Sequence, residues 1–111
     1  MNTNYIARKI TLPDAFKAKA DARLAKLDKF FDDAVAEVKV SAQKDTATVE
    51  LTIRADGMVF RAENSDADKL DALDAAIDTI IRRIRRNKTR LQKKLKVSAF
   101  DQIEAIPDEY S

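Results

Sequence analysis

The segment Thr79–Lys96 concentrates positive charge in a pattern that suits the binding of phosphate. Its sequence, TIIRRIRRNKTRLQKKLK, holds nine Lys or Arg residues and no acid, with Ile or Leu between them. Arginine can hold phosphate oxygens in a bidentate manner, and lysine acts as a mobile point charge. Positive charge spread over such a length matches a nucleic-acid backbone.

On a helix, which turns by about 100° per residue, these charges separate from the apolar residues. Ile80 and Ile84 fall on the same side as Leu70, Leu73 and Ile77. The opposite side carries Arg82, Arg86, Arg90 and Lys93, and Arg83, Arg85, Lys94 and Lys96 widen it. Lys88 interrupts the apolar stripe, so we expect the last part of the helix to leave the core and to be exposed.

A solvated helix end is the plainer interpretation of the same charges. Five aspartates precede the bases, as the helix dipole favours: Asp66, Asp68, Asp71, Asp74 and Asp78. The dipole acts only within the last turn, however, whereas this run covers about four turns of 3.6 residues each. Like charges without an interspersed acid also repel one another. We therefore favour a binding surface.

The predicted first helix repeats the theme with a stripe of cations beside its apolar face. This stripe consists of Lys19, Arg23, Lys26 and Lys29. If the two helices pack side by side, the two stripes could border a common groove. Phe16 and Phe31 fall on the predicted core face, which leaves few rings for base stacking. The pattern favours recognition of the shape and phosphates of folded RNA over a single-strand stacking platform.

The residue types argue against catalysis. The chain contains no Cys and no His, which excludes thiol nucleophiles, histidine bases and Cys/His zinc sites. The aspartates Asp66–Asp78 could be metal or acid/base carboxylates, but a helix N-terminus attracts such residues for electrostatic reasons alone. No Gly-rich phosphate loop occurs. We expect no catalytic or metal site, no cofactor and no small-molecule substrate.

Hydrophobic periodicity predicts the elements that position these charges. Residues 1–10 alternate weakly and predict a short strand, with Ile6 and Ile10 on one side and Tyr5 on the other. The expected helices run from Pro13 to Phe31 and from about Asp68 to Lys96, the second capped by Ser65 or Asp66. Residues 36–43, 47–55 and 58–63 predict strands, joined by turns at Lys44–Thr46 and Asp56-Gly57.

The expected order is β-α-β-β-β-α. A four-stranded sheet with one apolar face needs a cover on that face, and two amphipathic helices provide it. We therefore predict an α+β, two-layer sandwich with both helices on one face of the sheet. A chain of 111 residues is long enough for one domain. We assign residues 1–96 to this domain and residues 97–111 to an acidic tail or the start of a linker.

Charge and hydropathy along the chain indicate the cellular setting. All 21 basic residues precede Val97, whereas residues 97–111 contain only acids among their charged side chains. A basic body with an acidic tail favours a polyanionic partner. No signal peptide and no apolar run long enough to span a membrane is found. We expect a cytoplasmic protein without membrane contact, and a monomeric isolated domain.

Two segments resemble the ribosome hibernation factors, the ribosome-associated inhibitor and hibernation-promoting proteins of bacteria and plastids. Residues 10–33, ITLPDAFKAKADARLAKLDKFFDD, are similar to the family's first strand–helix segment, with its core at Ala22, Arg23, Lys26 and Leu27. Residues 68–91, DKLDALDAAIDTIIRRIRRNKTRL, resemble its second helix. Leu70 is a departure, because the family usually has Tyr there.

The resemblance implies a fold similar to double-stranded-RNA-binding domains. It also implies a site between the helices for small-subunit ribosomal RNA at the decoding centre, which blocks mRNA and the A- and P-site tRNAs and preserves idle ribosomes. It assigns RNA contacts to Arg23, Lys26, Arg82, Arg86, Lys88 and Arg90. Charge alone adds Lys19, Lys29, Arg83, Arg85, Lys93 and Lys94. A stand-alone structured-RNA binder and a module for an acidic protein partner remain as alternatives.

Overall fold

The computed structural model describes residues 1–55 and 57–86 and contains the predicted elements in the predicted order. The strands are β1 (Asn2–Arg8), β2 (Val35–Gln43), β3 (Thr46–Ala55) and β4 (Met58–Asp66). The helices are α1 (Asp14–Leu24), a short 3-10 helix η1 (Ala25–Leu27) and α2 (Lys69–Arg86). Within the described ranges no helix is long and apolar enough to cross a membrane.

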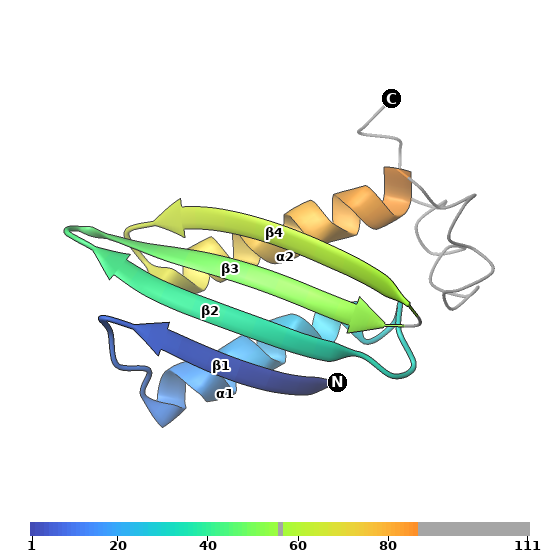
Figure 1. The fold of residues 1–111 in the computed structure, drawn as a ribbon, viewed down its shortest axis with the longest axis horizontal. Coiled ribbons are helices and arrows are strands. Elements are labelled where there is room, and N and C mark those ends of the chain that lie inside the picture. The colour runs from blue at the N-terminus through green and yellow to red at the C-terminus, as the bar shows by residue number, and fades with distance from the viewer. Residues whose placement is uncertain (56, 87–111) are drawn as a thin grey trace.

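The four strands form one sheet in the order β1-β2-β3-β4 (Figure 1). β2, β3 and β4 are antiparallel neighbours joined by short turns. β1 is parallel to β2, because the connection between them crosses over through α1. It follows that β1 and β4 run in the same direction, and that α1 and α2 both return along the sheet in the opposite direction.

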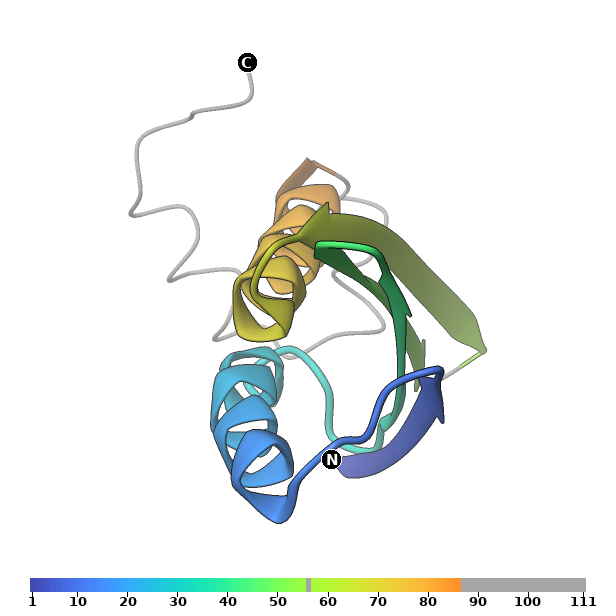
Figure 2. The ribbon, with the colours of Figure 1, turned by 90° about the vertical axis from the view of Figure 1, so that its left-hand side faces the viewer.

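Both helices lie on the same side of the curved sheet, and its other face is left uncovered by any described element (Figure 2). Strand alternation explains this arrangement, because Val38, Val40, Leu51 and Ile53 all point to the helical side and are fully buried. α2 contributes its apolar stripe to the same core. The predicted α+β class with two helices on one face is confirmed.

The first helix ends earlier than predicted. α1 stops at Leu24, and the chain continues as the tighter η1 rather than as an α-helix to Phe31. Leu24, Leu27 and Phe30 are all buried, and their spacing of three residues matches the 3-10 period of about three residues per turn. Tighter winding therefore keeps these side chains in the core as the chain turns toward β2.

The second helix also begins differently from the prediction. β4 extends to Asp66, so the predicted caps Ser65 and Asp66 lie in the strand. Asp68 caps α2 instead: its Oδ1 accepts hydrogen bonds from the backbone N–H of Leu70 at 2.7 Å and of Asp71 at 3.4 Å. The predicted continuation of the helix to Lys96 lies outside the described residues.

In β1 the side facing the helices is the one that carries Tyr5. Its ring packs edge-on against Phe16 with centroids 6.4 Å apart, and its hydroxyl donates to the Asp21 carboxylate. Ile6 points to the uncovered face and is 38% exposed. Burial, followed by the hydrogen bond and the charge of Asp21, raises the pKa of the Tyr5 hydroxyl well above its usual range. The phenol thus stays a donor that ties β1 to α1.

Candidate nucleic-acid interface

The arginines of α2 project from a helix that the core holds firmly. Ile80 and Ile84 are fully buried against the sheet, whereas Arg82 and Arg86 are exposed. The helix carries all of Arg82, Arg83, Arg85 and Arg86 in its last turns, with no acid after Asp78. Helical geometry thus presents at least two guanidinium groups to solvent on a rigid support, which is the arrangement that phosphate binding requires.

Contacts within the domain distinguish the α2 arginines from one another. Arg82 donates to the Thr79 hydroxyl at 3.4 Å, and that hydroxyl donates to a backbone carbonyl one turn earlier. Arg83 lies on the flank toward the sheet and donates to the backbone carbonyl of Arg61 on β4. Arg83 therefore links α2 to β4 through this hydrogen bond, so at least one of its N–H donors contributes to the fold.

A shallow depression lies on the flank of α2 near its basic end. Its lining residues Asp78, Ile81, Arg82 and Arg85 recur at helical spacing on one side of the helix. Two guanidinium groups at this spacing can receive a phosphate group, and Asp78 marks the boundary of the positive surface. Among the described residues, those that line the depression all come from α2 and none comes from α1.

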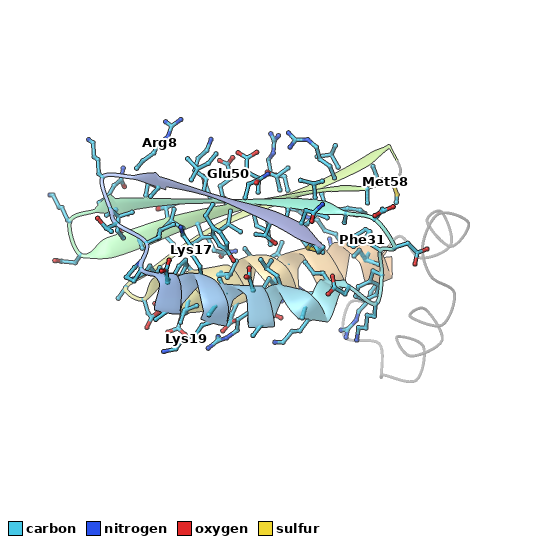
Figure 3. The ribbon with its side chains drawn as sticks, turned by 90° about the horizontal axis from the view of Figure 1, so that it is seen from below. Arg8, Lys17, Lys19, Phe31, Glu50 and Met58 are labelled. Atoms are coloured by element: carbon cyan, nitrogen blue, oxygen red, sulfur yellow. The ribbon has the colours of Figure 1, made fainter. Side chains whose placement is uncertain are left out.

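The four cations predicted on the first helix differ in their surroundings: three are exposed to solvent and one forms an ion pair. Lys19, Lys26 and Lys29 are exposed, and Lys19 points away from the sheet (Figure 3). Lys29 also lies 5.5 Å from the ring centroid of Phe30. Arg23 is only 36% exposed and forms an ion pair with Asp74 of α2. Of the four cations predicted on the first helix, Lys19 in α1, Lys26 in η1 and Lys29 after it are exposed to solvent, and Arg23 joins the two helices.

The Arg23–Asp74 pair fixes how the two helices lie beside each other. The pair brings an acid of α2 into the stripe of cations on the first helical segment, and the chain then continues from Arg23 into η1, which carries Lys26. The common groove expected from the sequence is thus mixed in charge where α1 faces α2. Positive charge dominates only beyond it, where Arg82, Arg85 and Arg86 extend.

The aspartates at the start of α2 have structural roles. Asp68 caps the helix, and Asp74 pairs with Arg23. No group of three or more potential ligand side chains that could hold a metal ion occurs in residues 1–55 and 57–86. Asp68 and Asp74 thus have partners within the fold, and the position of the acidic run at the start of α2 suits the helix dipole.

Aromatic side chains do not contribute to the basic surface over the described part of the chain. Phe16, Phe30 and Phe31 are buried, and Phe60 packs against Phe31 with centroids 5.7 Å apart. Tyr5 is engaged with Asp21. The described surface therefore fits contacts to phosphates better than stacking of bases.

Several predicted site residues cannot be placed. Lys88, Arg90 and Lys93, together with Lys94, lie outside the described residues. The role of Asp74 as a partner of Arg23 was not predicted from the sequence. The two residues are 51 positions apart, and no local spacing signals such a contact.

The sequence matches the family model for sigma 54 modulation protein / S30EA ribosomal protein over residues 3–92. Curated relatives include proteins named ribosome hibernation promotion factor. That of Lactococcus lactis is 32% identical over 82% of this chain and 51% of its own length, and that of Staphylococcus aureus is 33% identical over 77% and 47%. The one of Bacillus subtilis is 30% identical over 86% and 53%. The chain spans about half the length of these relatives.

Solved structures agree with the sequence comparison. The N-terminal domain of Thermus thermophilus Protein Y has a TM-score of 0.71 and 31% identity, and the match covers 78% of this chain and 98% of that one. A ribosomal subunit interface protein from Coxiella burnetii has a TM-score of 0.69 over 80% of this chain and 99% of its own, and its 12% identity supports the fold alone. This chain belongs to the sigma 54 modulation protein / S30EA family, that of the ribosome hibernation factors which its helices resemble.

Proposed function

We propose that this chain is a ribosome hibernation factor that binds the small ribosomal subunit at the decoding region. Bound there, it excludes mRNA and the A- and P-site tRNAs, inhibits translation and stabilises idle ribosomes. The observation that carries the proposal is the exposed arginine face at the end of α2, supported from behind by buried Ile80 and Ile84. Membership of the hibernation-factor family supports the ribosome as the source of the phosphates.

The proposed mechanism requires no chemical step. Arg82 and Arg86 hold phosphates of folded ribosomal RNA. Exposed charge along α1 and the segment after it is added by Lys19, Lys26 and Lys29. The predicted Lys88, Arg90 and Lys93 extend the same run. The rigid sandwich then occupies the space that mRNA and tRNA need, so inhibition results from occlusion. Such a factor acts in the cytoplasm as a non-enzymatic protein.

Co-sedimentation tests the ribosome as the partner. Purified small subunits are pelleted at increasing salt with the wild-type chain or with the Arg82→Glu/Arg86→Glu variant. We expect the wild type to pellet at low salt and the variant to stay in the supernatant. An Arg54→Glu/Arg61→Glu variant is the control for the change in net charge. It reverses two exposed arginines on the uncovered face, away from the end of the sheet that carries Arg8, and Arg54 also pairs with Glu37 at 3.6 Å. Equal pelleting of all three proteins would refute the proposal.

Footprinting locates the site on the subunit. Chemical probing of small-subunit RNA with and without the protein should show protection at decoding-region nucleotides, and the Arg82→Glu/Arg86→Glu variant should leave them reactive. Protection elsewhere only would contradict the decoding-region site while keeping the ribosome as partner.

The alternatives predict other outcomes. A stand-alone structured-RNA binder would bind free RNA duplexes as tightly as it binds small subunits. A module for an acidic protein would leave the RNA reactivities unchanged. The arginine face fits phosphate better than an acidic protein partner. The large apolar residues that are exposed in the described chain lie outside α2, and Ile81 beside the arginines is partly buried against the core.

A further inference from the structure

A second group of cations lies at one end of the sheet, apart from the basic helix faces. Arg8 ends β1, Lys9 follows it, and Lys44 lies in the two-residue turn between β2 and β3. Lys9 and Lys44 line the same hollow at this end of the sheet. Arg8 projects from the uncovered face, on the opposite side of the domain from Lys19 (Figure 3). We call Arg8, Lys9 and Lys44 the hairpin-end patch.

A row of hydroxyl groups continues the patch across the sheet. In the strand register Arg8 lies beside Ser41, Ser41 beside Thr48, and Thr48 beside Ser65. The hydroxyls of Thr48 and Ser65 lie 2.7 Å apart and hydrogen-bond to each other. Cations and hydroxyl groups together are the side chains that proteins most often use on phosphate oxygens.

The backbone at Lys9 and Lys44 departs from what these residues prefer. Lys9 has φ 60° and Lys44 has φ 51°, a region that glycine, asparagine and aspartate adopt far more readily. The turn between β3 and β4 uses a glycine for the same purpose, Gly57 at φ 77°. Backbone strain of this kind concentrates at functional sites. Both lysines thus hold a backbone conformation that glycine would adopt at a lower cost.

The surrounding charges limit the patch to this end of the sheet. Asp45 is the acid that shares the hollow with Lys9 and Lys44. The neighbouring row of the uncovered face is mixed, because Lys39 lies beside Glu50 and Glu50 beside Glu63. The positive surface thus ends there. Arg8 lies on the uncovered face, and Lys9 and Lys44 lie at the end of the sheet, where Lys44 also lines a hollow with Lys69 at the start of α2.

We propose that the hairpin-end patch is a second phosphate-binding surface, which contacts a different RNA segment from the one that the helices hold. The proposal rests on the proposed function, because it takes its partner, folded RNA, from there. In Figure 3 the sheet and the helical layer lie between Arg8 and Lys19, so we expect a different stretch of phosphate backbone at each of them. The domain therefore lies between two RNA segments and holds them at once.

Replacing Lys9 and Lys44 by glycine removes their charge and keeps the positive φ of the backbone, so it tests the patch directly. In a Lys9→Gly/Lys44→Gly variant we expect the melting temperature to stay the same or rise, because glycine suits positive φ. We expect binding to small subunits to weaken, and the slope of log K against log salt to fall by about 1.4–1.8 for two lost phosphate contacts. A Lys9→Arg/Lys44→Arg variant keeps the charge and should bind like the wild type.

The outcomes separate this proposal from the proposed function. If the wild type does not bind small subunits at all, the proposed function fails. If the wild type binds and Arg82→Glu/Arg86→Glu abolishes binding, but Lys9→Gly/Lys44→Gly binds with unchanged affinity and slope, the hairpin-end patch alone is refuted.

Directed cleavage tests whether two RNA segments are contacted. The chain has no cysteine, so one introduced cysteine is the only attachment site for an iron chelate that cleaves nearby RNA. Gln43→Cys places the chelate beside the patch, and Ala22→Cys places it on exposed α1. We expect the two positions to cleave different nucleotides of small-subunit RNA. Cleavage from Ala22→Cys only, or of the same nucleotides from both, would overturn the proposal.

Discussion

Arg23 shows that a cation in the expected stripe can serve the fold. It lies in line with Lys19 and Lys26, yet its guanidinium group pairs with Asp74 and links α1 to α2. One oxygen of that carboxylate, Oδ1, is buried without a hydrogen-bond partner. The ion pair therefore holds a partly desolvated acid between the two helices. If Arg23 contacts RNA as proposed, we expect this pair to open first.

A double-mutant cycle of Arg23→Ala and Asp74→Ala measures the interaction free energy between these two side chains. Both side chains are about a third exposed, and water weakens such pairs, so we expect a coupling energy of about 1 kcal/mol or less in denaturant unfolding. Asp74→Ala alone should strengthen binding to small subunits, because it removes an acid and releases Arg23. Weaker binding by a folded Asp74→Ala variant would mean that Arg23 must be held in place to contact RNA.

α2 is the element on which fold and function meet, since the same helix anchors the core and presents the arginines. We expect Ile84→Ala to cost about 2–5 kcal/mol of unfolding free energy, because it leaves a cavity against the sheet. Arg82→Ala and Arg86→Ala should each cost no more than about 0.5 kcal/mol, because both side chains are exposed. Urea unfolding with unchanged m-values measures the difference. Similar losses in all three variants would mean that the two faces are assigned wrongly.

The elements with strong periodicity were the ones that the sequence predicted well. α2, β2 and β3 each repeat their apolar residues at one clear period, so their type and buried face follow from spacing. The predicted end of the first helix was wrong because Leu24, Leu27 and Phe30 follow one another at intervals of three residues. Over so short a segment, the apolar pattern of a 3-10 helix cannot be told from that of an amphipathic α-helix. The similarity to double-stranded-RNA-binding domains stays a prediction.

The site was predicted less completely than the fold, for a physical reason. The exposed arginines of α2 lie within one helix, and local spacing is enough to find them. The Arg23–Asp74 pair and the hairpin-end patch join segments that only the sheet topology brings together, because Arg8 meets Ser41 through the β1–β2 register. Contacts between distant segments leave no periodic signal in a single sequence.

At the scale of the whole molecule, positive charge occurs on both sides of a two-layer domain. The helical layer carries two exposed arginines and three exposed lysines: Arg82, Arg86, Lys19, Lys26 and Lys29. The hairpin-end patch lies at one end of the sheet. Two arrangements are compatible with such a charge distribution. Either both surfaces touch RNA in the same complex, or each supports a separate mode of binding.

Combining the variants distinguishes simultaneous from alternative contact. Surfaces more than about 10 Å apart contribute additively to binding when both are engaged. We therefore expect the losses in log K of Arg82→Glu/Arg86→Glu and Lys9→Gly/Lys44→Gly to add in the quadruple variant, measured by salt titration on small subunits. The loss of salt slope should add in the same way, because each phosphate contact releases its own counterions. Alternative modes would instead give weak single effects and a much larger combined one, since either surface could then replace the other.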